Sequence, residues 1–400
     1  MTHAVAAEPG PTLWLSCHVH YACRHSGACC SAGWPLPVEM RAVAGIEAAV
    51  ATGWLRTVDG EPIWLRETAD APDDIAGTFR LAAGACVFHA PRHPGEAVDA
   101  GAAGARSGAR HCAVHAVLGQ DALPSSCRHF PRVCLIDDRG VRVSLSHYCP
   151  TAAAMLVDHE GPVEIVPGPD AVPGTAVPEG LDAREELPPL LTPDVLMDLE
   201  SLSAWERHVV RTLAGPSAPD GPPERVLHVL QAQAERLREW IPGGAPLTAR
   251  IDGLSAVGVE GAPQRDGGTE AIDSARRVRS LQLAAGACRA PWTWPDPPED
   301  LDSLDRRLVA PLWMAASPVV RRYLAAKAFG AWISYQADAA RGLVAWLQLA
   351  LDVLRVEAAR ACGNAGTPLD RDRLLMAVRQ ADLLLVHYAG PVTSKGLSPP

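Results

Sequence analysis

Cysteine is distributed very unevenly along this chain, and that distribution limits what the N-terminal part can fold into. The sequence contains 11 cysteines in 400 residues. Four of them lie with three histidines in the stretch Cys17–Cys30, which ends in the adjacent pair Cys29-Cys30. Of the other seven, all but Cys288 and Cys362 lie before residue 150. The first part of the fold therefore has to accommodate most of the thiols.

The length of the chain removes one common reason for many cysteines. A chain of 400 residues can bury a large apolar core without cross-links, unlike a small secreted domain that depends on disulfides. The N-terminal sequence MTHAVAAEPGPTLWLSC has no positively charged segment followed by a continuous apolar run. We therefore expect no signal peptide and a cytoplasmic location. In a reducing compartment, clustered cysteines indicate metal or redox chemistry rather than disulfides.

The charge of the chain argues against nucleic acid and membrane as partners. The formal net charge is −10, and Lys327 and Lys395 are the only lysines. Because acidic residues are in excess and no basic run occurs, a nucleic-acid surface is not expected. The longest apolar stretch, residues 329–354, is interrupted by charged side chains. A membrane-spanning helix is therefore not expected either.

A change of pattern along the chain predicts an α+β protein, with an irregular cysteine-cluster domain followed by a mainly α-helical domain. We expect the cysteine-cluster, metal-binding domain at residues 1–160. Residues 161–193 are rich in proline and glycine, which indicates a linker. From residue 194 to 400 the apolar spacing of three and four residues predicts helices.

Local patterns place elements within the first domain. Apolar spacing over residues 40–50 predicts an amphipathic helix. Residues 79–88 are expected to form a strand or a hairpin, and residues 133–145 a hairpin that turns at residues 137–140. Residues 1–16 are expected to be a loose lead-in, and the Gly- and Ala-rich residues 94–110 a flexible surface loop.

Cap and breaker residues place the helices of the second domain. Thr192-Pro193-Asp194 predicts the start of a helix that ends at Gly215, and Pro222 predicts the start of the next. A Gly-rich loop region is expected at residues 243–270. We further expect a long helical stretch over residues 317–362, broken near Gly342, and a last helix over residues 367–387.

The chemistry of thiolates makes metal binding the leading interpretation of the cysteines. Thiolates are soft ligands suited to zinc and to iron–sulfur clusters, and four of them complete either kind of site. Their spacing, C-x5-C-x5-C-C, matches neither zinc fingers nor ferredoxins. If the backbone is extended at Cys29-Cys30, the two side chains point to opposite faces. The candidate metal ligands are Cys17, Cys23, Cys29, Cys30, Cys86, Cys112, Cys127 and Cys149.

Three other interpretations of these thiols stay open on the sequence alone. The cysteines could be unrelated buried residues, or a disulfide framework. They could also include a nucleophile, with Cys112 or Cys127 working beside one of the histidines His111, His115 and His129.

Some residues of the region are expected to have structural roles. Cys134 alternates with apolar residues on a predicted strand and is expected in the core, while Cys288 and Cys362 are expected to serve helix packing. His129 and His147 are expected to be hydrogen-bonded polar residues rather than ligands.

The second half of the cysteine-rich region resembles a known family. The run C-A-V-H-x2-L-G-x3-L-P-x2-C-R-x-F-P-R begins at Cys112, and S-L-S-x2-C-P ends at Pro150. Together with the earlier C-C-x3-W and C-x-F, these motifs resemble the flagellin lysine-N-methylase family and, more broadly, the zinc- or iron-chelating cysteine-cluster (YkgJ-type) proteins. The likeness covers residues 15–157, and weaker likenesses lie at residues 321–332 and 374–387. The wide spacing before Cys29 and the insertion at residues 94–110 depart from the family pattern.

The resemblance implies a bound metal or iron–sulfur cluster and methyl transfer from S-adenosylmethionine to an exposed lysine of a protein substrate. Arg128 and Arg132 are the candidate cofactor-binding residues, because a guanidinium can pair with the carboxylate of a methionine moiety. They could equally offset the negative charge of a thiolate site, or simply cap a helix end or face solvent. No strand–GxGxG–helix turn for a nucleotide occurs in the sequence.

The sequence therefore supports three functional hypotheses. The first is a cluster-containing lysine N-methylase. The second is a zinc- or iron-chelating module without catalysis. The third is an interaction protein whose helical half binds a partner and whose metal is purely structural.

Overall fold

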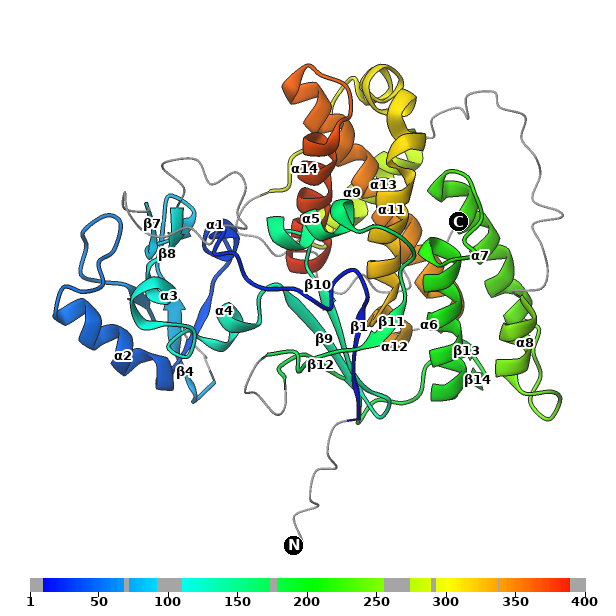
Figure 1. The fold of residues 1–400 in the computed structure, drawn as a ribbon, viewed down its shortest axis with the longest axis horizontal. Coiled ribbons are helices and arrows are strands. Elements are labelled where there is room, and N and C mark those ends of the chain that lie inside the picture. The colour runs from blue at the N-terminus through cyan, green and yellow to red at the C-terminus, as the bar shows by residue number, and fades with distance from the viewer. Residues whose placement is uncertain are drawn as a thin grey trace, which may run out of the picture. The chain divides into compact units, whose positions relative to one another are not determined.

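Helices and strands both contribute to the fold, and the predicted α+β class is confirmed (Figure 1). The computed structural model describes residues 10–67, 72–91, 110–172, 178–254, 274–288, 293–336 and 338–388. The chain forms two compact units. We call residues 21–132 and 149–152 the thiol unit, and residues 1–20, 133–148 and 153–400 the helical unit.

This division differs from the predicted boundaries at residues 160 and 193. Strand β1 (Thr12–Leu15) lies in the helical unit, because it pairs with β10 (Gly140–Leu145) and with β11 (Ile165–Pro167). Residues 1–16 were expected to be a loose lead-in, and that expectation is wrong for β1. The region expected to be a linker contributes strands as well, so it is part of the helical unit.

The thiol unit consists of short elements joined by turns. In chain order they are α1 (Ala28–Ser31), β2 (Pro37–Glu39), α2 (Met40–Ala51), β3 (Leu65–Arg66), β4 (Ile75–Phe79), β5 (Leu81–Ala82), β6 (Ala85–Cys86), β7 (His89–Pro91), β8 (Arg110–Cys112), α3 (Ala113–Leu118) and α4 (Ser125–His129). Strands β2, β4 and β3 form an antiparallel sheet, and β5–β6 and β7–β8 are separate antiparallel pairs. The helix and the hairpin predicted before residue 90 are confirmed as α2 and β5–β6. The predicted loop at residues 94–110 lies almost wholly outside the described residues.

An aromatic core holds the thiol unit together. Trp64, Phe79 and Phe88 are buried, with ring centroids 5.6–6.0 Å apart. Gly77 allows β3 to approach β4 closely, because a Cβ at this position would lie 2.3 Å from the carbonyl oxygen of Arg66. The buried thiols of Cys30 and Cys86 belong to the same core, so the thiol group is built into the packing of this unit.

The helical unit contains a five-stranded sheet in the order β11-β1-β10-β9-β12. Its remaining strands are β9 (Arg132–Asp137) and β12 (Leu181–Asp182), and β13 (Leu190–Thr192) and β14 (Val195–Leu196) form a separate pair. Strands β9 and β10 are the two arms of the predicted hairpin. Gly140, with φ 113°, begins β10 where the chain before β1 crosses it, and a Cβ there would lie 2.3 Å from the carbonyl oxygen of Pro11.

Helices make up most of the helical unit. They are α5 (Pro150–Asp158), α6 (Leu199–Ala214), α7 (Pro223–Arg238), α8 (Leu247–Leu254), α9 (Ser274–Gly286), α10 (Leu301–Leu304), the π-helix η1 (Asp305–Val309), α11 (Ala310–Ala328), α12 (Ile333–Gln336), α13 (Ala339–Ala365), α14 (Arg371–Asp382) and the π-helix η2 (Leu383–Tyr388). The long helix α13 is mostly buried and packs against α7, α9, α11 and α14.

Four predicted helix boundaries are wrong. The helix expected from Thr192 begins at Leu199, because Asp198 supplies the N-cap and the earlier residues form β13 and β14. Helix α11 runs through Ser317-Pro318, where a start was expected. The break expected near Gly342 occurs before α13, whose N-cap is Asp338. The last helix likewise begins later, after the cap Asp370.

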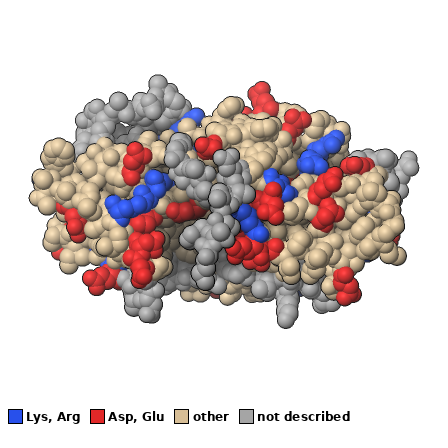
Figure 2. All heavy atoms as spheres, turned by 90° about the horizontal axis from the view of Figure 1, so that it is seen from below, with Lys and Arg blue, Asp and Glu red and all other residues tan. Residues whose placement is uncertain are grey.

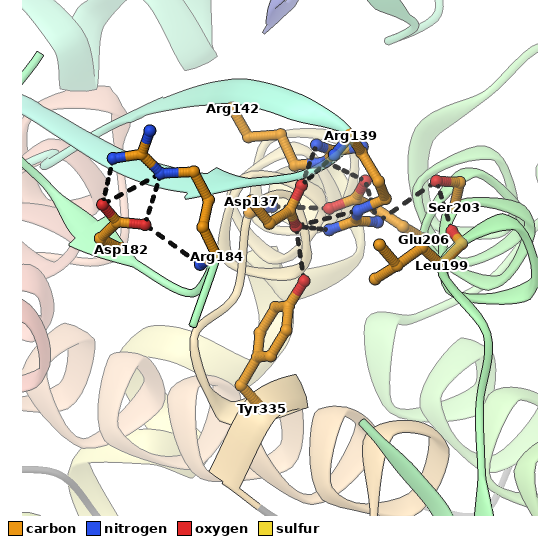
Figure 3. A network of polar contacts seen from close by, with 10 residues as sticks. Asp137, Arg139, Arg142, Asp182, Arg184, Leu199, Ser203, Glu206 and Tyr335 are labelled. Carbon is orange, nitrogen blue, oxygen red and sulfur yellow. Dashed lines mark hydrogen bonds and ion pairs between the residues drawn. The ribbon is translucent and has the colours of Figure 1, made fainter. Parts of the chain in front are cut away.

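A buried ion-pair network fastens the β9–β10 hairpin to the helices (Figure 3). Arg139 donates to the Asp137 carboxylate at 2.6 Å, and Arg142 donates to Glu206 on α6 at 2.9 Å. The Tyr335 hydroxyl on α12 donates to Asp137 at 2.6 Å. Two carboxylates thus face two guanidinium groups, so the buried charges balance. The hairpin is held in place, and with it the residues that follow β10.

Two surface properties bear on possible partners. On the face that Figure 2 shows, the described Lys and Arg side chains lie among Asp and Glu side chains and form no continuous basic surface. Among the described residues, no helix combines the length and the apolar character needed to cross a membrane.

Candidate functional site

The adjacent pair Cys29-Cys30 lies on the short helix α1. Gly27 precedes the helix in the left-handed conformation, with φ 69°, and starts the helical turn through the bond from the Cys30 N–H to its carbonyl oxygen at 3.0 Å. The backbone is therefore helical here and not extended. Successive side chains on a helix point about 100° apart, so both sulfur atoms can reach the same side of the unit.

Three further cysteines reach this pair from separate elements. Cys86 ends β6 and is buried. Cys112 ends β8, where it pairs with His89 of β7 and caps α3. Cys127 lies on α4 and is half-buried. The five residues Cys29, Cys30, Cys86, Cys112 and Cys127 are called the thiol group below.

Hydrogen bonds between sulfur atoms connect the thiol group. Cys30 contacts Cys112, Cys29 and Cys86, and these contacts together with burial raise the pKa of Cys30. The bond between Cys30 and Cys112 acts in the opposite direction on its other partner and lowers the pKa of Cys112. When this pair first ionises, one proton therefore remains between the two sulfur atoms.

Cys127 feels the other thiols through space. Loss of hydration raises its pKa well above the usual value, and negative charge at Cys29, Cys112 and Cys86 raises it further. The thiol group thus places several weakly acidic thiols close together. The negative charge of each thiolate raises the pKa of the remaining thiols. A cation in their midst would remove this mutual repulsion.

Cys23 and Cys149 lie in the same unit but have a different environment. The Tyr21 hydroxyl lies 3.6 Å from the Cys149 sulfur, and the Arg132 guanidinium lies over the Tyr21 ring at 5.1 Å. Burial of its sulfur raises the pKa of Cys23, and charges at Cys29 and Cys149 add to this effect. These two cysteines therefore border the thiol group.

The other cysteines belong to the helical unit. Cys17 follows β1, is buried, and has a pKa raised to about 12 by burial, an effect opposed by Arg322. Cys134 is buried in β9, as expected of a core residue. Cys362 is buried in α13, and Cys288 follows α9 and is half-buried.

The two candidate cofactor-binding arginines have partners on α4 and beside it. Arg128 donates to the Ser125 hydroxyl at 3.4 Å, and Arg132 donates to the carbonyl oxygen of Arg128 at 3.5 Å. The Arg132 bond reaches a carbonyl oxygen in the last turn of α4, as in the capping interpretation, whereas the Arg128 bond reaches a side-chain hydroxyl on the first residue of this helix. Nδ1–H of His129 donates to the Ser125 carbonyl oxygen at 2.9 Å, as expected of a satisfied polar residue.

The thiol group is not arranged as a complete coordination site. Within the described ranges, no group of three or more His, Cys, Asp or Glu side chains has the geometry of a metal site. The donor chemistry nevertheless suits a soft metal ion, since thiolates are the ligands that zinc and iron–sulfur centres prefer.

A second polar cluster, in the helical unit, was missed in the sequence analysis. Its centre is Asp382 on α14, which accepts hydrogen bonds from His147, Lys327 and Tyr323. The sequence held two weak signals for it. Asp382 is an acid within the apolar run Ala381–Val386, and Lys327 is one of two lysines in a chain rich in arginine.

Comparison with known proteins adds no identification: no family model, curated protein or solved structure matches this chain significantly. The fold and the thiol group define a two-unit α+β protein with a cysteine-rich unit. The function therefore has to be argued from the arrangement of the residues.

Proposed function

We propose that the thiol unit binds a thiophilic metal through its thiol group. The observation that carries the proposal is the convergence of five sulfur atoms from α1, β6, β8 and α4, all within one small unit. Unrelated buried cysteines have no reason to meet, whereas four thiolates are what a tetrahedral ion requires. The five thiols supply one more than that number.

The contacts between the sulfur atoms favour one ion over a larger cluster. Two thiolates bound to the same tetrahedral ion, with metal–sulfur bonds of about 2.3 Å, lie roughly 3.8 Å apart. This is close to the length of a hydrogen bond between sulfur atoms, which is the kind of contact that Cys30 makes with three neighbours. Thiolates of an iron–sulfur cluster bind different iron atoms and are spread more widely. We therefore place zinc before an iron–sulfur cluster.

Metal binding should depend on pH, because the thiols have to ionise before they can bind the metal. Metal binding needs thiolates, and Cys30 and Cys127 are held as thiols by their surroundings. A dication lowers the cost of ionising them, so binding should release protons and become tighter as pH rises.

Metal analysis combined with cysteine substitution tests this proposal. Protein purified without oxygen should contain about one zinc per chain and little acid-labile sulfide. Cobalt(II) added to metal-free protein should give a thiolate-to-cobalt absorption band. Serine at four of the five thiol-group positions should weaken cobalt binding by at least about tenfold, and serine at the position outside the tetrahedral set should not. Cys288→Ser, a half-buried thiol of the helical unit, is the matched control.

Each result has a clear meaning for the proposal. Iron with an equal amount of labile sulfide would replace zinc by a cluster and keep the ligand set. A protein that gives no thiolate-to-cobalt band, or a Cys288→Ser variant as impaired as the thiol-group variants, would remove the metal from the thiol unit.

As the activity of the metal-loaded protein we propose methyl transfer from S-adenosylmethionine to a lysine amine. The support is the resemblance of residues 112–150 to the flagellin lysine-N-methylase family. The competing hypothesis is a metal-chelating or metal-stabilised interaction protein without catalysis. The two differ in one property that can be measured, because a methylase must bind the methyl donor.

Calorimetry with S-adenosylmethionine separates the two hypotheses. A methylase should bind the donor in the micromolar range, about −8 kcal/mol. Arg128→Lys should weaken binding by roughly 1.5–3 kcal/mol if the guanidinium meets the donor carboxylate, because the planar fork is lost. Arg24→Lys, at an exposed position of the same unit, is the control. Failure of metal-loaded protein to bind the donor would leave the chelator as the function.

A further inference from the structure

The core of the thiol unit holds the five sulfur atoms of the thiol group at different depths. Cys30 and Cys86 are buried, with 4% and 3% of their surface exposed. Cys29, Cys112 and Cys127 pack against the same core and are partly exposed. A small dissolved molecule can therefore reach three of the thiols directly, while the other two are shielded by their neighbours.

Cys30 is the thiol that connects the others. Helix α1, which carries it, packs against β6. The Cys30 sulfur is hydrogen-bonded to the sulfur atoms of Cys29, Cys86 and Cys112. A disulfide bond is about 2.0 Å long, so sulfur atoms that already touch can reach bonding distance through a small rotation of their side chains.

The three contacts of Cys30 differ in how well they suit a disulfide. Adjacent Cα atoms are about 3.8 Å apart, below the roughly 4.4–6.8 Å that a disulfide usually spans, so the pair Cys29-Cys30 is unsuitable. Cys86 is as buried as Cys30, so both sulfur atoms of that pair are shielded from an oxidant. Cys112 is partly exposed and ends β8, a different element from that of Cys30. The contact between Cys30 and Cys112 is therefore the one that an oxidant can convert to a disulfide.

We propose that Cys30 and Cys112 are a redox pair that forms a disulfide on oxidation by a peroxide, and that this bond abolishes metal binding. The metal part of this inference rests on the proposed metal binding, whereas the disulfide itself does not. The thiol group has five thiols and the disulfide uses two of them, so three remain. A tetrahedral thiolate site needs four, and the ion should therefore be released.

Hydrogen peroxide can oxidise the pair in two steps. The Cys112 sulfur attacks one peroxide oxygen, so that a sulfur–oxygen bond forms, the oxygen–oxygen bond breaks and hydroxide leaves. The Cys30 sulfur then attacks the sulfur of this sulfenic acid, which forms the disulfide and releases a second hydroxide. The two thiol protons convert both hydroxides to water, or solvent supplies these protons if the sulfur atoms start as metal-bound thiolates. Two electrons thus pass from the two sulfur atoms to one hydrogen peroxide, which becomes two molecules of water.

The position of Cys30 makes the oxidation reversible. A sulfenic acid without a neighbouring thiol can be oxidised further to a sulfinic acid, which most proteins cannot reverse. At Cys112 the sulfur of Cys30 is already in contact and closes the disulfide instead. A reductant that cleaves the disulfide restores all five thiols, so the ion can bind again.

Tandem mass spectrometry of the full-length, metal-free protein tests the disulfide without the metal. Reduced protein is treated with hydrogen peroxide, its remaining thiols are alkylated, and its disulfides are mapped. The bond between Cys30 and Cys112 should account for most of the disulfide formed, and Cys112→Ser should abolish it. Cys288→Ser, which changes a half-buried thiol of the helical unit, is the control and should form the bond to the same extent as the wild type.

Zinc release from the wild-type protein tests the effect on the metal and needs no variant to fold. Hydrogen peroxide added to zinc-loaded protein should release the ion, detected with a coloured zinc indicator, in proportion to the disulfide formed. Reduction with a phosphine should restore zinc binding. A disulfide mainly between other cysteines, a sulfinic acid at Cys112 in its place, or zinc retained by protein that contains the disulfide would each overturn the inference. Protein that forms the disulfide but binds neither zinc nor cobalt would keep the redox pair and remove the proposed metal function.

Discussion

The thiol group and the Asp382 cluster both bring titratable side chains together from distant parts of the sequence, but they differ in what completes them. Around Asp382, one carboxylate meets an ammonium, two donor groups of His147 and a hydroxyl, so charge and hydrogen bonds close within the unit. In the thiol group, the contacts of Cys30 lead to other thiols. The first cluster is stable on its own, whereas the second is a set of acids that gains most from an added cation.

Removal of the Asp382 carboxylate is expected to have the largest effect on stability. Asp382→Asn leaves the buried Lys327 ammonium without its counter-ion and should lower the free energy of unfolding by about 3–5 kcal/mol. Chemical denaturation measures it. Asp370→Asn, which keeps a side-chain acceptor at the N-cap of α14 and removes the surface ion pair with Arg373, should cost no more than about 1 kcal/mol. Equal losses in the two variants would show that the Asp382 cluster carries no special stability.

Metal removal should affect the other unit. If only the native state binds the ion, metal at about 100 times its dissociation constant stabilises the fold by roughly 2.7 kcal/mol. Chelation should therefore increase hydrogen exchange in α1, α3 and α4 and leave α13 and α14 protected. A loss of protection in both units would contradict the prediction that the metal stabilises only the thiol unit. Unchanged hydrogen exchange would argue against a structural metal.

A fall in pH should act first on the helical unit. Burial lowers the pKa of His387 from its usual 6.5 to about 4, and it also lowers the pKa values of His18 and His147. The unfolded chain therefore binds protons that the folded chain does not, so stability is complete above the unfolded pKa and is lost as pH falls. Each histidine contributes at most about 1.4 kcal/mol per pH unit. Hydrogen exchange in α14 should therefore increase as the pH falls from about 6.5 to about 4. His387→Gln should make this increase smaller.

The cysteines of the thiol unit could be predicted from the sequence, whereas the Asp382 cluster of the helical unit could not. Cysteine is rare, so its concentration before residue 150 is visible without a fold. The assignment of Cys17 to the helical unit could not be predicted, because it depends on β1 pairing with β10. His147 and Asp382 lie 235 residues apart, and no local pattern links a histidine after a strand to an acid in an apolar helix.

The smallest predicted effect concerns the border of the thiol group. Tyr21→Phe keeps the ring under Arg132 but removes the hydroxyl that lies 3.6 Å from the Cys149 sulfur. A single hydrogen bond of this kind contributes about 0.5–1.5 kcal/mol, so the free energy of unfolding should fall by no more than that. If Cys149 only borders the metal, the thiolate-to-cobalt band of Tyr21→Phe should match that of the wild type. A shifted band would show that Cys149 is itself a ligand, because the hydroxyl would then have been tuning a metal-bound sulfur.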